Sequence, residues 1–138
     1  MLSRVKRALE EGGVRLYAQP IQNAAGEGYH EILTRLESDG EIITPDRFIP
    51  LIAQFNLSHR FDLCVVEKVL IWLSTHATPP NSARFSVNLM PMTLNQKDVA
   101  AEIIALFERY AIAPQAVILE VTEEQAFSDS ESSIQNIQ

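Results

Sequence analysis

The sequence predicts an α/β fold in which helices alternate with about four strands, and three observations lead to this prediction. Segments with apolar residues at helical spacing alternate with short apolar runs along the chain. The two later runs, residues 85–87 and 117–119, each follow a helical segment, as strands of a buried parallel sheet do. No repeat or low-complexity tract interrupts the pattern. The alternation favours α/β architecture, but it does not distinguish a barrel from an open sheet.

The strands are indicated by alternating or continuous apolar residues between turn signals. They are expected at residues 14–18, 29–36, 84–89 and 117–121. A glycine-containing turn at residues 23–28 separates the first two strands, and a proline-rich loop at residues 77–83 precedes the third.

The helices are indicated by apolar stripes together with start and stop signals. They are expected at residues 2–9 with Ser3 as a possible cap, from Thr44 to Asn56, from Ser58 as cap to Leu73, and at residues 99–110. Thr44-Pro45-Asp46 supplies a cap hydroxyl, a proline at the first helical position and an acid in the first turn. Asn56 is a residue type that can end a helix in the left-handed conformation.

Composition and charge exclude several classes of protein. The 138 residues carry a net charge of −7, which argues against general binding to nucleic acid polymers or anionic membranes. Cys64 is the one cysteine, so no disulfide framework can form within the chain. The first ten residues lack the apolar run of a signal peptide. We expect a cytoplasmic location, with the alternative that the chain is the cytoplasmic part of a larger membrane-anchored protein.

Three polar residues lie within or at the ends of the predicted strands. They are Glu31, Asn88 and Glu120, and they supply two carboxylates and an amide oxygen from three different strands. In a parallel barrel the carboxyl ends of strands converge on one face, and such hard donors suit Mg²⁺, Mn²⁺ or Ca²⁺. The alternative is that the glutamates face solvent and that Asn88 is a turn residue.

Five blocks of sequence occur in order between Arg15 and Glu123. They are Leu16-Tyr17-Ala18-Gln19-Pro20-Ile21, Glu31-Ile32-Leu33-Thr34-Arg35, residues 45–52 with Phe48-Ile49-Pro50-Leu51, Phe85-Ser86-Val87-Asn88-Leu89, and Leu119-Glu120-Val121-Thr122-Glu123. Together they resemble the EAL domain family of cyclic-di-GMP phosphodiesterases, and the second block resembles its Glu-Ala-Leu signature.

The resemblance implies the fold and the function. The fold would be a partial TIM-like (β/α)8 barrel of EAL type, with residues 14–138 as its N-terminal half and residues 1–13 as a linker helix from a possible upstream domain. The parent protein would hydrolyse cyclic-di-GMP to pGpG in bacterial second-messenger signalling, using Mg²⁺ or Mn²⁺. The alternative is a degenerate EAL domain that binds cyclic-di-GMP or a protein without hydrolysis.

The resemblance also implies roles for single residues. Glu31, Asn88 and Glu120 would be metal ligands, while Gln19 and Arg35 would contact the substrate, with the Arg35 guanidinium on a phosphate. Glu123 would support a loop. The alternatives are that Arg35 pairs with a surface acid and that Glu123 caps a helix beginning near residue 128.

Several positions depart from the family pattern. Ile32 stands where the signature has alanine, Thr34 where it has leucine, and Met90 where the family has serine; Met90 and Met92 are expected to be packing residues. The chain ends before the family's Asp-Asp-Phe-Gly block, its lysine strand and a further glutamate. We therefore expect an incomplete two-metal site and no hydrolysis by this chain alone.

The expected partners follow from the same resemblance. They are cyclic-di-GMP, a second copy of the chain or the missing C-terminal half of the domain, and a GGDEF or sensory domain upstream. A half barrel leaves sheet edges with unpaired backbone groups, which is the reason to expect pairing with a second copy or with the other half.

Overall fold

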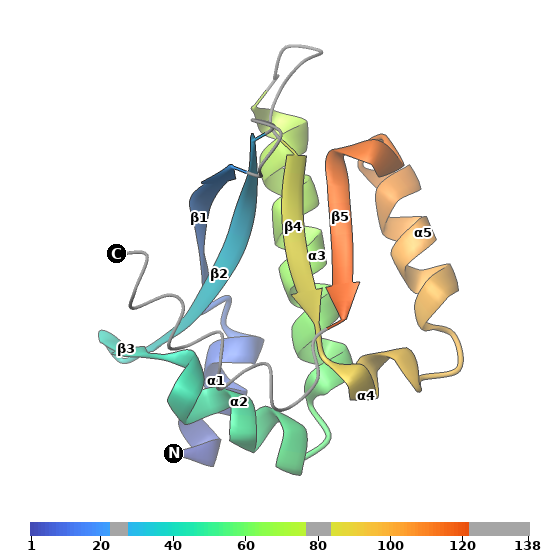
Figure 1. Ribbon diagram of the computed structural model, residues 1–138. Helices are drawn as coiled ribbons and strands as arrows, with labels where there is room; N and C mark the ends of the chain where they lie inside the picture. Colours follow the sequence, from blue (N-terminus) through green and yellow to red (C-terminus); the bar gives the residue numbers. More distant parts are fainter. Residues whose placement is uncertain (23–27, 77–83, 122–138) are drawn as a thin grey trace.

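The computed structural model describes residues 1–22, 28–76 and 84–121. Its elements are α1 (Leu2–Glu10), β1 (Val14–Gln22), β2 (Gly28–Ser38), β3 (Glu41–Ile43), α2 (Pro45–Gln54), α3 (Ser58–Thr75), β4 (Arg84–Leu89), α4 (Pro91–Leu94), α5 (Val99–Arg109), the 3₁₀ turn η1 (Pro114–Ala116) and β5 (Val117–Val121). Figure 1 shows one sheet with strand order β1-β2-β4-β5 and with β3 beside β2. The predicted α/β class and the four main strands are confirmed.

The sheet is mixed. β1 and β3 run antiparallel to β2, whereas β2, β4 and β5 are mutually parallel neighbours. The short strand β3 was not expected from the sequence. It exists because Asp39 and Gly40, with φ of 54° and 78°, reverse the chain after β2 and return it antiparallel.

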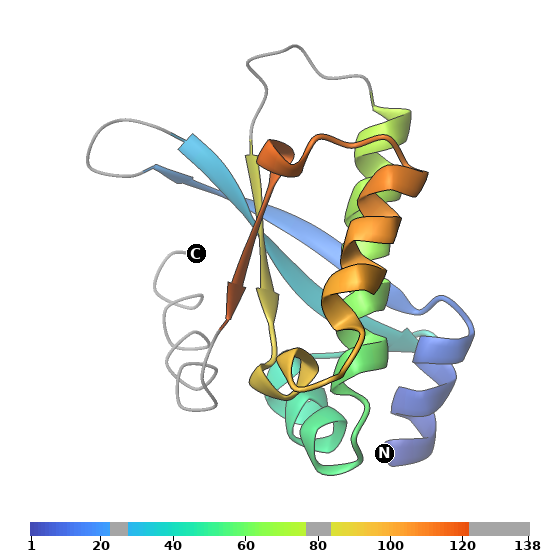
Figure 2. The same ribbon diagram turned by 90° about the vertical axis from the view of Figure 1, so that its right-hand side faces the viewer.

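One face of the sheet is covered by helices. In Figure 2, α3 and α5 lie along this face, while α2 and α4 lie near the carboxyl ends of β4 and β5. The side chains on the helix side form one core, which includes Ile32, Leu36, Phe85, Val87 and Leu89 from the strands together with Phe48, Ile52, Val66 and Leu70 from the helices. Each fully buried aliphatic side chain contributes about 1.5–3 kcal/mol, so this core holds the sheet to the helices. No described helix lies on the other face.

The helix boundaries test the predicted capping residues. Thr44 occupies the N-cap position of α2 as expected, but its hydroxyl donates to the Asp46 carboxylate and does not cap a backbone N–H. Asn56 has a φ of 58°, which confirms its left-handed conformation. The predictions for Ser3 and Ser58 are wrong, because Met1 caps α1 and Leu57 caps α3. Ser58 is instead the buried first residue of α3, where tertiary packing overrides its capping preference.

The two methionines after β4 differ. Met90 is 4% exposed and belongs to the core, as expected, whereas Met92 is 42% exposed. The prediction for Met92 is wrong because α4 turns the chain directly after Met90 and directs Met92 outward. Only the position of α4 in the fold determines which of the two faces the core.

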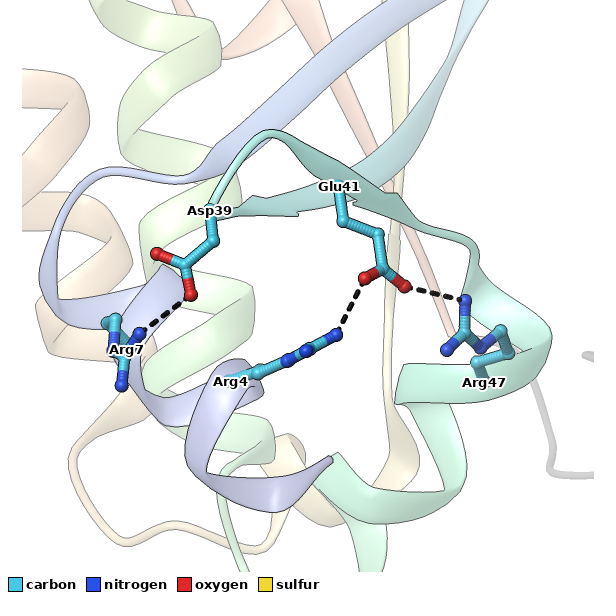
Figure 3. A network of polar contacts seen from close by, with 5 residues as sticks. All are labelled: Arg4, Arg7, Asp39, Glu41 and Arg47. Carbon is cyan, nitrogen blue, oxygen red and sulfur yellow. Dashed lines mark hydrogen bonds and ion pairs between the residues drawn. The ribbon is translucent and has the colours of Figure 1, made fainter.

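The first helix is fixed to the β2–β3 turn. Its apolar face, with Val5, Ala8 and Leu9, is buried. Figure 3 shows the polar contacts at its edge, Arg4 to Glu41 at 2.6 Å and Arg7 to Asp39 at 2.8 Å, and the contact of Arg47 on α2 with the same Glu41 at 3.5 Å. These side chains are more than a third exposed, so each ion pair contributes little, and burial of the apolar face provides most of the attachment.

None of the helices among the described residues combines the length and the apolar character that a membrane span requires.

Candidate functional site

The candidate site is built on the face of the sheet opposite the helices. Strand register pairs Gln19 with Glu31, Glu31 with Ser86, and Asn88 with Glu120. Side chains of paired neighbours share a face, and residues two apart along a strand share it as well. All five side chains therefore belong to one face of four adjacent strands, and we call this group the polar row.

Two hydrogen bonds connect the polar row across the strands. Asn88 Nδ2 donates to Glu31 Oε1 at 3.2 Å, which joins β4 to β2. Ser86 Oγ donates to Glu120 Oε1 at 3.1 Å, which joins β4 to β5. Glu31 and Asn88 are half-buried, whereas Glu120 is exposed. The structure thus brings the three predicted metal ligands onto one face, with β4 between the two carboxylates.

The three predicted metal ligands do not all lie at the carboxyl ends of their strands. Asn88 and Glu120 are each the last but one residue of their strands. Glu31 is the fourth residue of β2, a strand of 11 residues, and it pairs with Ser86 rather than with Asn88. Glu31 is therefore two residues below the level of Asn88, and its contact with the Asn88 amide spans this step.

The three predicted metal ligands, Glu31, Asn88 and Glu120, do not form a compact cluster of acidic and histidine side chains. Within the described part of the chain no group of three His, Cys, Asp or Glu side chains could hold a metal ion. The polar row contains two carboxylates on strands that flank β4, so their backbones are about 10 Å apart by ordinary strand spacing. An amide must supply the third donor, and the assignment of these three residues as ligands stays a prediction.

The predicted substrate contacts lie on the same face. Arg35 follows Glu31 by four residues on β2, and its Nη1 donates to the Thr34 carbonyl at 2.7 Å. In residues 1–22, 28–76 and 84–121, no acidic side chain forms an ion pair with Arg35. The Oε1 atom of Gln19 is buried and has no hydrogen-bond partner in the same ranges. Their roles as substrate contacts stay predictions.

The departures from the signature lie away from this face. Ile32 is 8% exposed and packs in the core under the helices. Thr34 pairs in register with Leu16, again on the helix side. The altered residues therefore do not change the polar row. Glu123 and the helix expected near residue 128 lie outside the described residues.

Sequence reasoning missed two polar residues, one in the polar row and one on the helix α3 that covers the opposite face of the sheet. Ser86 is two residues before Asn88 on one strand, and this spacing alone could have identified it as a neighbour. Asp62 is a carboxylate inside the apolar stripe of α3 and is 1% exposed. It accepts hydrogen bonds from Met90 N at 2.7 Å and from Thr93 Oγ1 at 2.5 Å. Burial raises the pKa of Asp62 to about 6 despite these two bonds.

The groove between α3 and α5 on the outer side has a different character. It has a volume of about 570 Å³ and is lined by His59, Cys64, Glu67, Glu102 and Arg109 among others. His59 pairs with Glu102 at 2.8 Å, and Tyr110 donates to Glu67 at 2.8 Å. Each of its two carboxylates is thus paired with a basic side chain, Glu102 with His59 and Glu67 with Arg109 at 3.7 Å, whereas the carboxylates of the polar row contact the neutral donors Ser86 and Asn88.

Comparison with known proteins agrees with the sequence motifs and the fold. The family model of the EAL domain matches residues 2–138. The chain is 62% identical over 138 residues to a probable cyclic di-GMP phosphodiesterase, PdeA, of Escherichia coli. The alignment covers all of this chain and 19% of PdeA, so the chain spans about a fifth of that relative's length.

Solved structures show the same fold. The FimX EAL domain of Xanthomonas citri in complex with c-diGMP superimposes with a TM-score of 0.77 at 20% identity, over 92% of this chain and 50% of that chain. The PaMucR phosphodiesterase in its c-di-GMP complex gives a TM-score of 0.73 at 26% identity, over 96% of this chain and 55% of that chain. Because the family model matches nearly the whole length of the chain, the chain belongs to the EAL domain family.

Proposed function

We propose that this chain supplies the N-terminal part of a cyclic-di-GMP site, and that the protein to which it belongs hydrolyses cyclic-di-GMP to pGpG with Mg²⁺ or Mn²⁺. The observation that carries the proposal is the polar row: Glu31, Asn88 and Glu120 share one face of three adjacent strands, and Asn88 contacts Glu31. The names of the relatives and the ligands bound to the structural neighbours support it.

The residues present fit a divalent cation by the chemistry of their donors. Two carboxylates and one amide oxygen are hard ligands, and waters or phosphate oxygens complete the coordination of Mg²⁺ or Mn²⁺ in such sites. A bound cation would supply Lewis-acid stabilisation of charge on a phosphodiester. Asn88 presents its Nδ2 to Glu31, so binding one cation with both residues requires a half turn of the amide to present Oδ1.

The neighbouring residues suit the rest of the ligand. The planar guanidinium of Arg35 can donate two parallel hydrogen bonds to a phosphate. The buried, unpartnered Oε1 of Gln19 can accept from a nucleotide N–H or hydroxyl, which would relieve the cost of an unsatisfied polar atom. In this proposal Arg35 and Gln19 bind and orient the dinucleotide, while Glu31, Asn88 and Glu120 hold the cation.

The test is calorimetric titration of cyclic-di-GMP into the chain with Ca²⁺, which hard oxygen donors also bind. We expect Arg35→Lys to weaken binding at least tenfold, because lysine loses the two-pronged contact with phosphate. Arg15→Lys is the matched control, since Arg15 lies beside Arg35 on β1 but is already paired with Glu37 at 3.0 Å. No binding by the unaltered chain, or equal losses in both variants, would contradict the proposal.

Hydrolysis is assayed separately by chromatography of pGpG with Mn²⁺. All three lysines lie outside the sheet, with Lys6 on α1, Lys68 on α3 and Lys97 between α4 and α5. We therefore expect the chain alone to form pGpG at least tenfold more slowly than an intact EAL phosphodiesterase. Binding without hydrolysis by the longer protein would favour the alternative, a domain that senses cyclic-di-GMP without cleaving it.

A further inference from the structure

Asp62 is a buried carboxylate that connects two elements distant in sequence. It lies on α3, is 1% exposed, and its Oδ2 atom accepts both hydrogen bonds that come from the start of α4. These bonds come from Met90 N at 2.7 Å and from Thr93 Oγ1 at 2.5 Å. Residues 28 and 31 positions away are thus held by one oxygen atom.

The contact takes the place of the carboxylate at the third helical position of a capping box, which α4 lacks because its third residue is Thr93. Met90 is the N-cap of α4, and its apolar side chain cannot accept a hydrogen bond from the backbone N–H groups at the start of the helix. In a capping box an acidic side chain within the helix accepts from the N-cap N–H. Here the acidic side chain comes from another helix: Asp62 on α3 accepts a hydrogen bond from the N–H of Met90. It also accepts one from the hydroxyl of Thr93, the third residue of α4. The start of α4 is therefore fixed by α3.

The fixed segment directly follows the candidate site. Met90 is two residues after Asn88, whose amide donates to Glu31 across the sheet. The path of the backbone between Asn88 and Met90 sets the height and direction of the Asn88 side chain. We propose that Asp62 is a positioning residue of the polar row, which holds the end of β4 so that the Asn88 amide lies beside Glu31. Its relevance to binding rests on the proposed function.

The two oxygens of Asp62 differ in a way that allows a clean test. Oδ2 accepts both bonds, whereas Oδ1 is buried and has no hydrogen-bond partner in the described ranges. An asparagine at this position can put its carbonyl oxygen in the place of Oδ2 and so keep both bonds. Asp62→Asn is thus the conservative variant, and Asp62→Ala removes both bonds.

A control must separate positioning from general loss of stability. Val66, one turn further along α3, is 0% exposed, and Val66→Ala creates a cavity without removing a hydrogen bond to α4. If Asp62 acted only by stabilising the fold, Val66→Ala would disturb the polar row as much as Asp62→Ala does.

The experiment follows the side-chain amide signal of Asn88 by ¹H–¹⁵N NMR of the full chain, assigned through its loss in Asn88→Ser. We expect Asp62→Ala to shift this signal and to weaken Mn²⁺ binding about tenfold. Asp62→Asn and Val66→Ala should leave the signal near its original position. If Asp62→Ala fails to fold, Thr93→Val, which removes one of the two bonds, should shift the signal by a smaller amount.

The possible outcomes separate the two proposals. An Asn88 signal that Asp62→Ala and Thr93→Val leave in place, or that Val66→Ala shifts equally, would overturn the positioning role. Absence of Mn²⁺ binding by the unaltered chain would contradict the proposed function, yet the amide signal would still report whether Asp62 positions Asn88.

Discussion

Asn88 Nδ2 lies 3.2 Å from Glu31 Oε1, and this hydrogen bond joins two strands across 57 residues of sequence. The amide provides a partial positive charge to a half-buried carboxylate that faces the same side of the sheet as Glu120. A divalent cation at this point would replace the amide hydrogens as the partner of Glu31.

The first prediction concerns the carboxylates of the polar row. Glu31→Gln and Glu120→Gln should each weaken Mn²⁺ binding about tenfold or more, because a neutral amide replaces a charged ligand. Electron paramagnetic resonance of free Mn²⁺ measures the affinity. Glu37→Gln is the matched control, since Glu37 lies on the same strand and pairs with Arg15. An equal loss in the control would mean that the cation responds only to overall charge.

The second prediction concerns Asn88→Asp. The substitution places a carboxylate beside Glu31, and like charges at hydrogen-bond distance repel each other. In chelator at neutral pH, we expect a lower melting temperature than in the unaltered chain. Added Mg²⁺ should restore the melting temperature by binding the enlarged set of carboxylates. Thermal unfolding with and without Mg²⁺ measures both effects. If the melting temperature of Asn88→Asp were the same in Mg²⁺ as in chelator, this would count against a cation at this position.

The third prediction follows from the pKa of Asp62, which burial raises from its ordinary value of 3.8 to about 6. Between these values the folded state keeps a proton that the unfolded chain has released. The stability from this group is therefore complete below about pH 4 and is lost as the pH rises through 6. Asp62→Asn does not titrate, so its free energy of unfolding should exceed that of the unaltered chain by an increasing margin over this range.

The margin should change by about 3 kcal/mol between pH 4 and pH 7, at about 1.4 kcal/mol for each pKa unit. Denaturant unfolding at each pH measures it. His59, which is paired with Glu102 at 2.8 Å, is the charged group that acts on the Asp62 carboxyl, and both residues are unchanged in Asp62→Asn. A difference that stays flat with pH would show that Asp62 does not release a proton here.

The fourth prediction concerns Gly13, where β2 passes close to the end of α1. A Cβ atom at this position would lie 2.3 Å from the carbonyl oxygen of Glu37. The Gly13 N–H donates a hydrogen bond to the Ala8 carbonyl, and the Gly13 carbonyl accepts one from the Glu37 N–H, at 2.7 Å each. Gly13→Ala should therefore cost about 1–3 kcal/mol of unfolding free energy or more. Gly12→Ala meets open space and should cost about 1 kcal/mol through its φ of +74° alone. Denaturant unfolding of both variants compares them.

The fifth prediction concerns self-association at the edge of β5. Ile118 and Val121 are 37% and 48% exposed there, and β5 is the last strand in the order of the described sheet. An exposed apolar edge pairs readily with another strand. We expect sedimentation at micromolar concentration to show a dimer or larger species, and Ile118→Lys to reduce it. A cooperatively folded monomer with or without this substitution would contradict the prediction.

The sequence by itself determined the longer helices, the four main strands and the separation of polar from apolar faces along each strand. These features depend on local periodicity: alternation along β2 separates Glu31 from Ile32, whatever the rest of the chain does. The left-handed Asn56 and the N-cap Thr44 were also predictable, because their conformations depend on neighbouring residues alone.

Only the tertiary structure decided which residues meet. Three contacts join positions that lie tens of residues apart. They are the register that pairs Glu31 with Ser86, the hydrogen bond from Asn88 to Glu31, and the hydrogen bond from Met90 N to Asp62. No local pattern specifies such contacts, because strand register and helix docking are set by packing of the whole core. For the same reason Ser58 is buried rather than capping, because tertiary packing outweighs its capping preference, and Met92 faces outward, because α4 turns the chain directly after Met90.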